Sequence, residues 1–367
     1  MSWSWEQKNW PEFFYDDLVL RAFEEEFIHK SGMLFGVCKH LDRDDQNIVR
    51  VNLLSEEALK TSEIEGAYLD RESIQSSIRC HFGLQFDRTR IKPAEHGISE
   101  MMLDLYDTFA EPLTHETMCN WQGLLCEGRR DLNDLGCYRS HTDPMRIVSG
   151  SVYEPEIHFI APPSSNVRDE MNRFITWFNG KAPSKKASLS PLIRAGIAHL
   201  HFVSIHPFED GNGRLARAIA EKALAQAVGY PTLIALAQTI NKKRNEYYKA
   251  LETTSKSLNI TDWLAYFAQT ILTAQDSALQ MIEFVITKSK FLARFEKQIN
   301  KRQHKVLIRM FEEGPEGFKG GLSAANYMSI IRTSSATTTR DLKDLVTKGA
   351  LTSTGQRRHT RYNLNLT

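Results

Sequence analysis

The stretch "SIHPFEDGNGRLAR", residues 204–217, decides how this chain is interpreted. It combines one histidine, two acidic side chains, a Gly-Asn-Gly run and two arginines. Segments with helical patterning lie on both sides, one from Pro191 to Val203 and one rich in alanine that begins near Arg214 and ends at Gly229. We therefore predict a tight loop that joins two helices.

The backbone of this loop suits a bound phosphate. Gly211, Asn212 and Gly213 can turn successive N–H groups inward to form a concave anion site. The start of the following helix adds free amides and the positive end of its dipole. Arg214 and Arg217 share one face of that helix, where their guanidinium groups can hold phosphate oxygens.

The other polar side chains of the loop indicate chemistry at that phosphate. Asp210 offers a hard oxygen ligand of the kind that Mg²⁺ prefers. His206, at the other mouth of the loop, has an ordinary pKa suited to taking a proton from an attacking hydroxyl. Phe208 lies between them and is expected to point into the core and hold the loop down.

The segment "HPFEDGNGRLAR" matches without departure the signature H-x-F-x-[D/E]-G-N-G-R-x-x-R of Fic-domain proteins, and the chain resembles that family over roughly residues 95–290. Members of the family resemble one another in transferring AMP from ATP to a protein hydroxyl. The resemblance implies ATP as the substrate, pyrophosphate as the leaving group, His206 as general base and Asp210 as the Mg²⁺ ligand. It also implies that Arg214 and Arg217 neutralise the β and γ phosphates.

The resemblance extends to residues outside the signature. The segment "NKKRNEYYKAL", residues 241–251, is similar to the family segment that closes over adenine, and the hairpin near Val148 to Ile157 is similar to the flap that docks the target by strand addition. The nucleotide-binding residues implied in this way are Glu65, Val203, Phe208, Glu209, Asp210, Gly211, Asn212, Gly213, Arg214, Arg217, Asn245 and Tyr248.

An inhibitory element is implied by "TSEIEG", residues 61–66, which fits the family motif [S/T]-x-x-x-E-[G/N]. Glu65 would pair with Arg217, so that the γ phosphate cannot seat there and the resting enzyme is slow. The alternative is an ordinary solvated carboxylate near a helix end, with Gly66 as the C-cap.

The fold class expected is mainly α, with three domains. A helical N-terminal domain carrying the inhibitory motif covers residues 1–94, and the Fic helical bundle with its β-hairpin flap covers 95–300. Three short helices and a terminal hairpin predict a small winged helix over residues 301–367. Leu18, with Phe23, Phe27 and Leu34 after it at helical spacing, is expected to face the core.

Composition and charge narrow the class of protein. A net charge of +1 gives no bulk attraction to nucleic acid or membrane. The five cysteines include no C-x-x-C pair, which argues against a disulfide framework or a zinc site and favours a reducing cytoplasm. No secretion signal and no run long and apolar enough to span a bilayer is recognised, so we expect a cytoplasmic protein without a membrane partner.

The expected partner is a protein that presents a Ser, Thr or Tyr hydroxyl, including a copy of this chain, and a homodimer through helical faces is plausible. The basic turn "GQRRHTR", residues 355–361, is either a DNA contact or a solvated hairpin tip. Two alternatives to AMP transfer stay open: a nucleotide-sensing transcriptional regulator, and another Fic-type phosphoryl or nucleotidyl transfer. Gly213 and Arg214 favour AMP transfer, because phosphorylating variants generally depart from the motif there.

One pair of histidines and one cluster of tryptophans are interpreted as packing residues. His199 and His201 lie on an apolar helix and are expected to be core histidines rather than metal ligands. The cluster of Trp3, Trp5 and Trp10 is expected to pack against the following helices.

Overall fold

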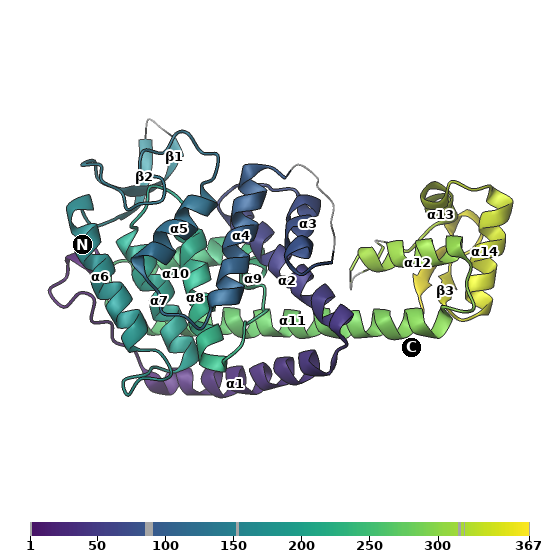
Figure 1. Ribbon diagram of the computed structural model, residues 1–367, viewed down its shortest axis with the longest axis horizontal. Coiled ribbons are helices and arrows are strands. Elements are labelled where there is room, and N and C mark those ends of the chain that lie inside the picture. The colour runs from purple at the N-terminus through teal and green to yellow at the C-terminus, as the bar shows by residue number, and fades with distance from the viewer. Residues whose placement is uncertain (1, 85–90, 152–153, 315–316, 319, 367) are drawn as a thin grey trace. The chain divides into compact units, whose positions relative to one another are not determined.

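The computed structural model describes residues 2–84, 91–151, 154–314, 317–318 and 320–366. It is mainly helical, as the sequence predicts (Figure 1). The helices in these ranges are α1 Asp17–His40, α2 Arg43–Ile64, α3 Arg71–His81, α4 Pro93–Thr108, α5 His115–Leu125, α6 Ser164–Gly180, α7 Pro191–Ile205, α8 Asn212–Val228, α9 Leu236–Lys242, α10 Arg244–Thr254, α11 Thr261–Phe295, α12 Lys301–Glu312, α13 Ala324–Ile331 and α14 Ser335–Thr347. The strands are β1 Arg146–Ser151, β2 Glu154–Ile160, β3 Leu351–Thr354 and β4 Arg361–Leu364.

The chain divides into two compact units. One contains the residues up to Gly36 together with Arg50–Ala278. The other contains Val37–Val49 together with the residues from Leu279 onward. The first unit includes all of the candidate site. The boundaries 1–94, 95–300 and 301–367 remain a prediction about how the chain is organised.

Local capping signals account for several helix ends. Pro93 occupies the first position of α4, where its missing N–H costs nothing. Thr114 caps α5 by accepting a hydrogen bond from the backbone N–H of Thr117. Gly229 ends α8 with a φ of +81°, a left-handed conformation that favours glycine.

The buried stripe of α1 differs from the predicted one at its start. Leu18 is 77% exposed, whereas Phe27 and Leu34 are buried. The residue that continues their seven-residue spacing toward the N-terminus is Leu20, which is also buried. Leu18 is two residues before Leu20, and residues two apart point about 200° away from each other around a helix. Leu18 therefore cannot belong to the buried stripe.

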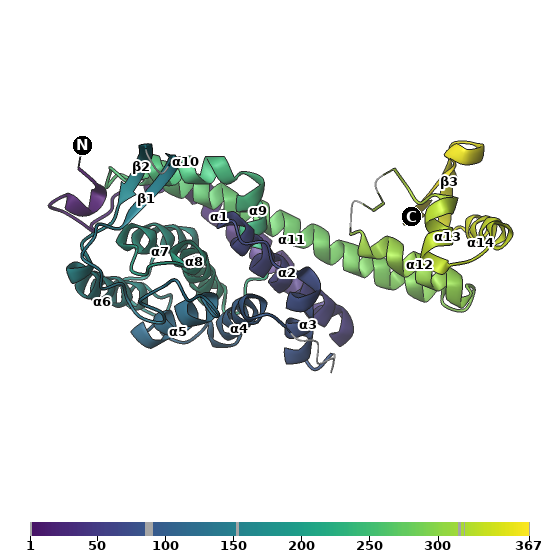
Figure 2. The ribbon, with the colours of Figure 1, turned by 90° about the horizontal axis from the view of Figure 1, so that it is seen from above.

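The helices α7 and α8 form the centre of the first unit, and they lie side by side (Figure 2). Almost every side chain of α7 is buried. Gly196 allows α11 to approach, because a Cβ at this position would lie 2.6 Å from a methyl carbon of Leu264. Trp263 of α11 donates a hydrogen bond from Nε1 to the carbonyl of Gly196. This packing fixes the helix that ends at the candidate loop.

The predicted hairpin is present as β1 and β2, which pair antiparallel with a register shift between Ile147 and Val148. The backbone N–H of Ala161 donates to the carbonyl of Met145 and closes the base of the hairpin. Residues 152–153, within the stretch likened to a flap, lie outside the described residues.

The second unit has its own core, built from α12, α13, α14 and the β3–β4 hairpin. Its most buried side chains include Val306, Leu307, Tyr327 and Leu345. This order of three helices and a hairpin agrees with the predicted elements, and the assignment as a winged helix remains a prediction. Across the residues that the structure describes, no helix is long and apolar enough to cross a bilayer.

Candidate nucleotide-binding and catalytic site

The loop between α7 and α8 reverses the chain through two left-handed residues. His206 ends α7 with a φ of +50°, and Gly211 precedes α8 with a φ of +91°. The predicted helix-loop-helix is therefore correct. The second helix begins at Asn212, slightly before the predicted start near Arg214, so the N–H groups of Asn212 and Gly213 belong to its first turn.

Two residues expected to bind nucleotide hold the loop together instead. Asn212 donates from Nδ2 to the carbonyl of Phe208 and accepts from the N–H of Phe208 at its Oδ1. The ring of Phe208 is completely buried and packs near Tyr138 and Phe202. Phe208 therefore points into the core, as expected, and offers a nucleotide neither its ring nor its hydrogen-bonding backbone. Asn212 is left with its backbone N–H.

The side chain of Glu209 binds backbone outside the loop. Its Oε2 accepts hydrogen bonds from the backbone N–H groups of Asn133 at 2.8 Å and Asp134 at 3.1 Å. The carboxylate thus braces the segment that follows α5. The contact of Glu209 with nucleotide remains a prediction.

Asp210 lies between two guanidinium groups. Its Oδ2 is 2.6 Å from Nη1 of Arg129, and its Oδ1 is 3.4 Å from Nη2 of Arg214. Arg129 also binds both carboxylate oxygens of Asp131. Sequence reasoning missed Arg129, which belongs to no recognised motif.

These contacts test whether Asp210 fits a metal ion. Both of its oxygens already stabilise positive charge beside the N-terminus of α8, and Mg²⁺ is commonly held by one or two carboxylates together with substrate phosphates. The donor therefore fits Mg²⁺ bound together with a nucleotide. Among the described residues there is no group of three or more His, Cys, Asp or Glu side chains that could hold a metal ion in the absence of a nucleotide.

Both predicted phosphate-binding arginines are buried in α8. Arg214 donates from Nη1 to the carbonyl of Leu125. Arg217, only 1% exposed, donates from Nε to Oγ1 of Thr61 at 2.7 Å and from Nη2 to Oε1 of Glu65 at 2.8 Å. The expected pairing of Glu65 with Arg217 is thus present. Thr61, the first residue of the "TSEIEG" motif, is a partner that the sequence analysis did not single out.

Gly213 explains how Glu65 reaches Arg217. A Cβ built on Gly213 would lie 2.2 Å from Oε1 of Glu65 and 3.3 Å from Nη1 of Arg217. Only glycine leaves room for the carboxylate at this position. Glu65 therefore covers the first turn of α8, where the free N–H groups favour an anion.

The segment likened to an adenine-closing region, residues 241–251, covers the end of α9 and most of α10, and one of its residues contacts the end of α2. The hydroxyl of Tyr248 donates to the carbonyl of Ile64, the residue before Glu65. Burial raises the pKa of Tyr248, so the hydroxyl keeps its proton as a donor. Asn245 is exposed on the same helix.

His206 is set up as a neutral base. Its Nδ1 lies 3.2 Å from the carbonyl oxygen of Val203, which can only accept, so Nδ1 carries the proton and the Nε2 lone pair is available. The pKa of His206 is lowered to about 4, chiefly by burial and in smaller part by the charge of Arg139, while the hydrogen bond to Val203 and the charges of Glu65 and Asp210 act in the opposite direction.

The other histidines of α7 are core residues, as expected. His199 and His201 are buried, and burial lowers the pKa of each to about 3. His199 shares a hydrogen bond of 3.0 Å with the hydroxyl of Tyr247, and Trp10 packs edge-on against His201. Trp10 therefore packs against a following helix as predicted, whereas Trp5 donates from Nε1 to the carbonyl of Ile160 and Trp3 packs edge-on against Phe159, both in β2.

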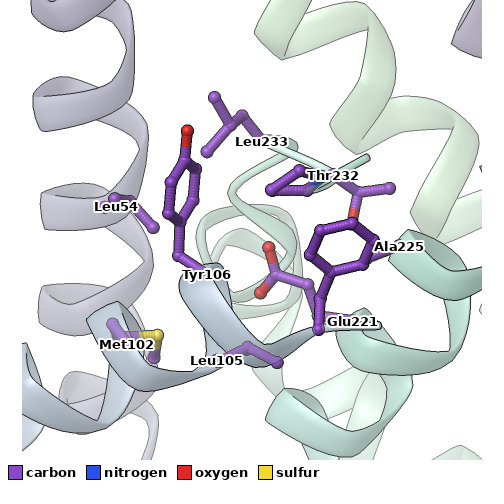
Figure 3. A pocket seen from close by; sticks show the side chains of 10 residues that line it. Leu54, Met102, Leu105, Tyr106, Glu221, Ala225, Thr232 and Leu233 are labelled. Carbon is purple, nitrogen blue, oxygen red and sulfur yellow. The ribbon is translucent and has the colours of Figure 1, made fainter. Parts of the chain in front are cut away.

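Glu57 and Glu221 are two buried carboxylates near Arg217 that no pattern in the sequence indicates. Glu57 accepts a hydrogen bond from the N–H of Ala237, and burial raises its pKa to about 7. Glu221, one turn after Arg217, points into a small pocket next to Tyr106 (Figure 3). Burial, and then the charge of Glu57, raise the pKa of Glu221.

Comparisons with known proteins agree with this geometry. Residues 112–224 match the family described as the Fic/DOC family, and residues 3–84 match one described as a domain of unknown function (DUF4172). Curated relatives named "Protein adenylyltransferase Fic" include those of Drosophila yakuba, 35% identical over 115 residues, and Aedes aegypti, 35% identical over 116 residues. Each match covers 30% of this chain and 21% of the relative, so the chain spans about a fifth of their length.

Solved structures share the fold at low sequence identity. A Fic family protein from Desulfovibrio desulfuricans has a TM-score of 0.54 at 19% identity, over 96% of this chain and 98% of its own. A Fic domain containing signaling protein from Bacteroides thetaiotaomicron has a TM-score of 0.53 at 18% identity, over 71% of this chain and 98% of its own.

Proposed function

We propose that this chain, which carries a Fic domain over residues 112–224, transfers AMP from ATP to a Ser, Thr or Tyr hydroxyl of a protein. The observation that carries the proposal is the loop itself. A neutral imidazole at His206 and the carboxylate of Asp210 flank the open N-terminus of α8, within the range that matches the Fic/DOC family, and the chain is similar over 115 residues to relatives named as adenylyltransferases. The regulator and the other nucleotidyl transfers explain this combination less directly.

Binding uses the first turn of α8. The N–H groups of Asn212 and Gly213 face the triphosphate, and the guanidinium groups of Arg214 and Arg217 take the β and γ phosphates. Asp210, which contacts Arg129 in this structure, would hold Mg²⁺, and the bound ion would neutralise phosphate charge.

Transfer uses His206. Nε2 accepts the proton of the target hydroxyl while its oxygen forms a bond to the α phosphorus, and the bond from that phosphorus to the bridging oxygen breaks to release pyrophosphate. Val203 supports this role because its carbonyl fixes the tautomer. Rate acceleration comes mainly from positioning and from charge held in place before the reaction.

Glu65 keeps the resting enzyme slow in this proposal. Its carboxylate occupies Nη2 of Arg217 and the space above Gly213, so a γ phosphate and Glu65 compete for one position. Autoinhibition therefore acts on how ATP seats, and Tyr248 holds the end of the inhibitory helix through Ile64.

The substrate is a protein segment that extends the flap hairpin as an added strand, because an edge strand presents unpaired N–H and C=O groups. A second copy of this chain is the first target to test. Label from ATP carrying ³²P at the α position should enter protein in a Glu65→Gly variant, in purified form and in lysate. Label at the γ position that enters protein instead would contradict AMP transfer.

DNA binding by the second unit is a second candidate function, favoured by the charges on α14. Arg340 and Lys343 are exposed, whereas Asp341 is buried against Arg302 and Asp344 is paired with Lys348. The outward face is therefore basic although the chain is nearly neutral. A gel-shift series with increasing salt should give weaker binding for Arg340→Gln, and identical curves for this variant and wild type would contradict it.

A further inference from the structure

A single buried guanidinium joins the flap to the catalytic loop. Arg139, 2% exposed, lies between α5 and β1. Its Nε donates to the carbonyl of His206 at 2.8 Å, Nη2 donates to the carbonyl of Pro162 at 2.5 Å, and Nη1 donates to Oγ of Ser164 at 2.8 Å. Its own backbone N–H donates to the carbonyl of Pro207.

Arg139 binds one group of partners at the base of the hairpin and another in the loop between α7 and α8. Pro162 follows directly on Ala161, whose hydrogen bond to Met145 closes the base of the β1–β2 hairpin. His206 and Pro207 belong to the loop that enters the candidate site. Because the guanidinium is planar and rigid, its fork fixes the distance between these two backbone segments.

The position of this contact matters because His206 is strained. A non-glycine residue with a φ of +50° is uncommon and persists only where its surroundings hold it. Arg139 binds the carbonyl oxygen of that same residue, so it holds the peptide plane from which the imidazole projects. A buried charge is costly unless it is fully hydrogen-bonded, and here the partners are four different backbone or hydroxyl oxygens.

We propose that Arg139 is a positioning residue that couples docking of a target at the flap to the orientation of the His206 imidazole. The proposal rests on the proposed function, since it uses His206 as the base and the hairpin as the docking strand. A target strand that orders the hairpin fixes its base at Pro162, and the guanidinium carries that constraint to the carbonyl of His206.

Arg194 is a matched control for the substitution. It is equally buried, at 1% exposed, and it also donates to backbone carbonyls, those of Phe178 and Ala223. Burial lowers the pKa of both guanidinium groups to about 10. Arg194 lies in the first turns of α7, at the opposite end of the helix from His206.

The kinetic test compares Arg139→Lys with Arg194→Lys, each in the Glu65→Gly background. Lysine keeps the charge and the stem but loses the fork. We expect Arg139→Lys to lower kcat for AMP transfer tenfold or more with an unchanged KM for ATP, and Arg194→Lys to lower only the melting temperature. An equal fall of kcat in both variants would assign Arg139 a merely structural role and overturn the proposal.

A second readout needs no turnover. The charged groups acting on His206 are Arg139, Glu65 and Asp210, so removing the Arg139 charge should raise the pKa of the imidazole followed by NMR. Arg139→Gln should shift this titration upward and Arg194→Gln should not, and equal titrations would overturn the proposal. If Arg139→Gln does not fold, the imidazole chemical shifts of His206 are compared in Arg139→Lys and Arg194→Lys. A change in Arg139→Lys that is absent in Arg194→Lys would support the proposal, and equal shifts would overturn it. Absence of AMP transfer in Glu65→Gly alone would reject the proposed function, while the NMR comparison still decides whether Arg139 acts on His206.

Discussion

The carboxylate of Glu65 lies 2.8 Å from Nη2 of Arg217, although 152 positions separate the two residues in sequence. Arg217 is almost completely buried, whereas the Glu65 side chain keeps 30% of its exposure. The Glu65 side of the ion pair is therefore accessible to solvent. A γ phosphate can take the position of Glu65 on Nη2 only by displacing this carboxylate, whereas the buried Nη1 of Arg217 has no hydrogen-bond partner among the described residues.

Glu65→Gln should raise AMP transfer about tenfold or more, because a neutral amide competes weakly with a γ phosphate for Arg217. The rate of label incorporation at fixed ATP measures it. The matched control is Glu63→Gln, which removes a charge two residues earlier, in the last turn of α2, where it is paired with Lys60. Equal rates in Glu65→Gln, Glu63→Gln and wild type would show that the pair does not restrain the enzyme.

Gly213→Ala should break the contact between Glu65 and Arg217 by steric displacement, since the added methyl would lie 2.2 Å from the carboxylate oxygen. In a double-mutant cycle of unfolding free energies, Glu65→Gln should then have a smaller effect in the Gly213→Ala background than in wild type. Residues in contact typically couple by roughly 0.5–3 kcal/mol. Additive effects of the two substitutions would mean that the methyl is accommodated without moving Glu65.

Arg129→Gln should strengthen metal binding severalfold in the presence of a non-hydrolysable ATP analogue. The guanidinium of Arg129 lies 2.6 Å from Oδ2 of Asp210, and its removal leaves that oxygen free for a cation. Titration with Mn²⁺ followed by electron paramagnetic resonance measures the affinity, with Arg130→Gln as the exposed neighbouring control. Weaker Mn²⁺ binding in Arg129→Gln would mean that Arg129 supports the bound metal and phosphates instead of competing for Asp210.

The buried histidines should make the protein sensitive to acid. His199 and His201 have pKa values of about 3 in the folded chain against an ordinary value of 6.5, so the unfolded chain binds more protons between these limits. Stability therefore falls as pH drops below about 6.5, by about 1.4 kcal/mol per pH unit for each group. Urea unfolding of His201→Phe should give a shallower slope by about that amount. The exposed control His29→Phe should retain the wild-type slope, and an unchanged slope in His201→Phe would contradict the account.

The parts of the site that the sequence predicts are those whose chemistry is local. Gly211 and the arginines of α8 occupy one continuous segment, so spacing alone predicts the turn and the shared helix face. The same holds for the hairpin, whose two strands are neighbours in sequence. Glu65 is predicted from the family motif, because spacing along the sequence cannot reveal its contact with Arg217.

The parts that sequence reasoning missed depend on distant segments. Arg139 binds His206, 67 positions away, and Arg129 binds Asp210, 81 positions away. No periodicity in the sequence indicates which distant residue such a guanidinium contacts. Glu209 and Phe208 were assigned to nucleotide because they lie within the signature. The side chain of Glu209 instead binds the backbone of Asn133, and the ring of Phe208 is buried in the core.

The intact mass of purified protein after incubation with ATP and Mg²⁺ tests the central claim most directly. The Glu65→Gly variant should gain the mass of one or more adenylyl groups, and Glu65→Gly with His206→Ala should gain none. A phosphate adduct without adenosine, or an adenylyl adduct that persists without His206, would contradict the account.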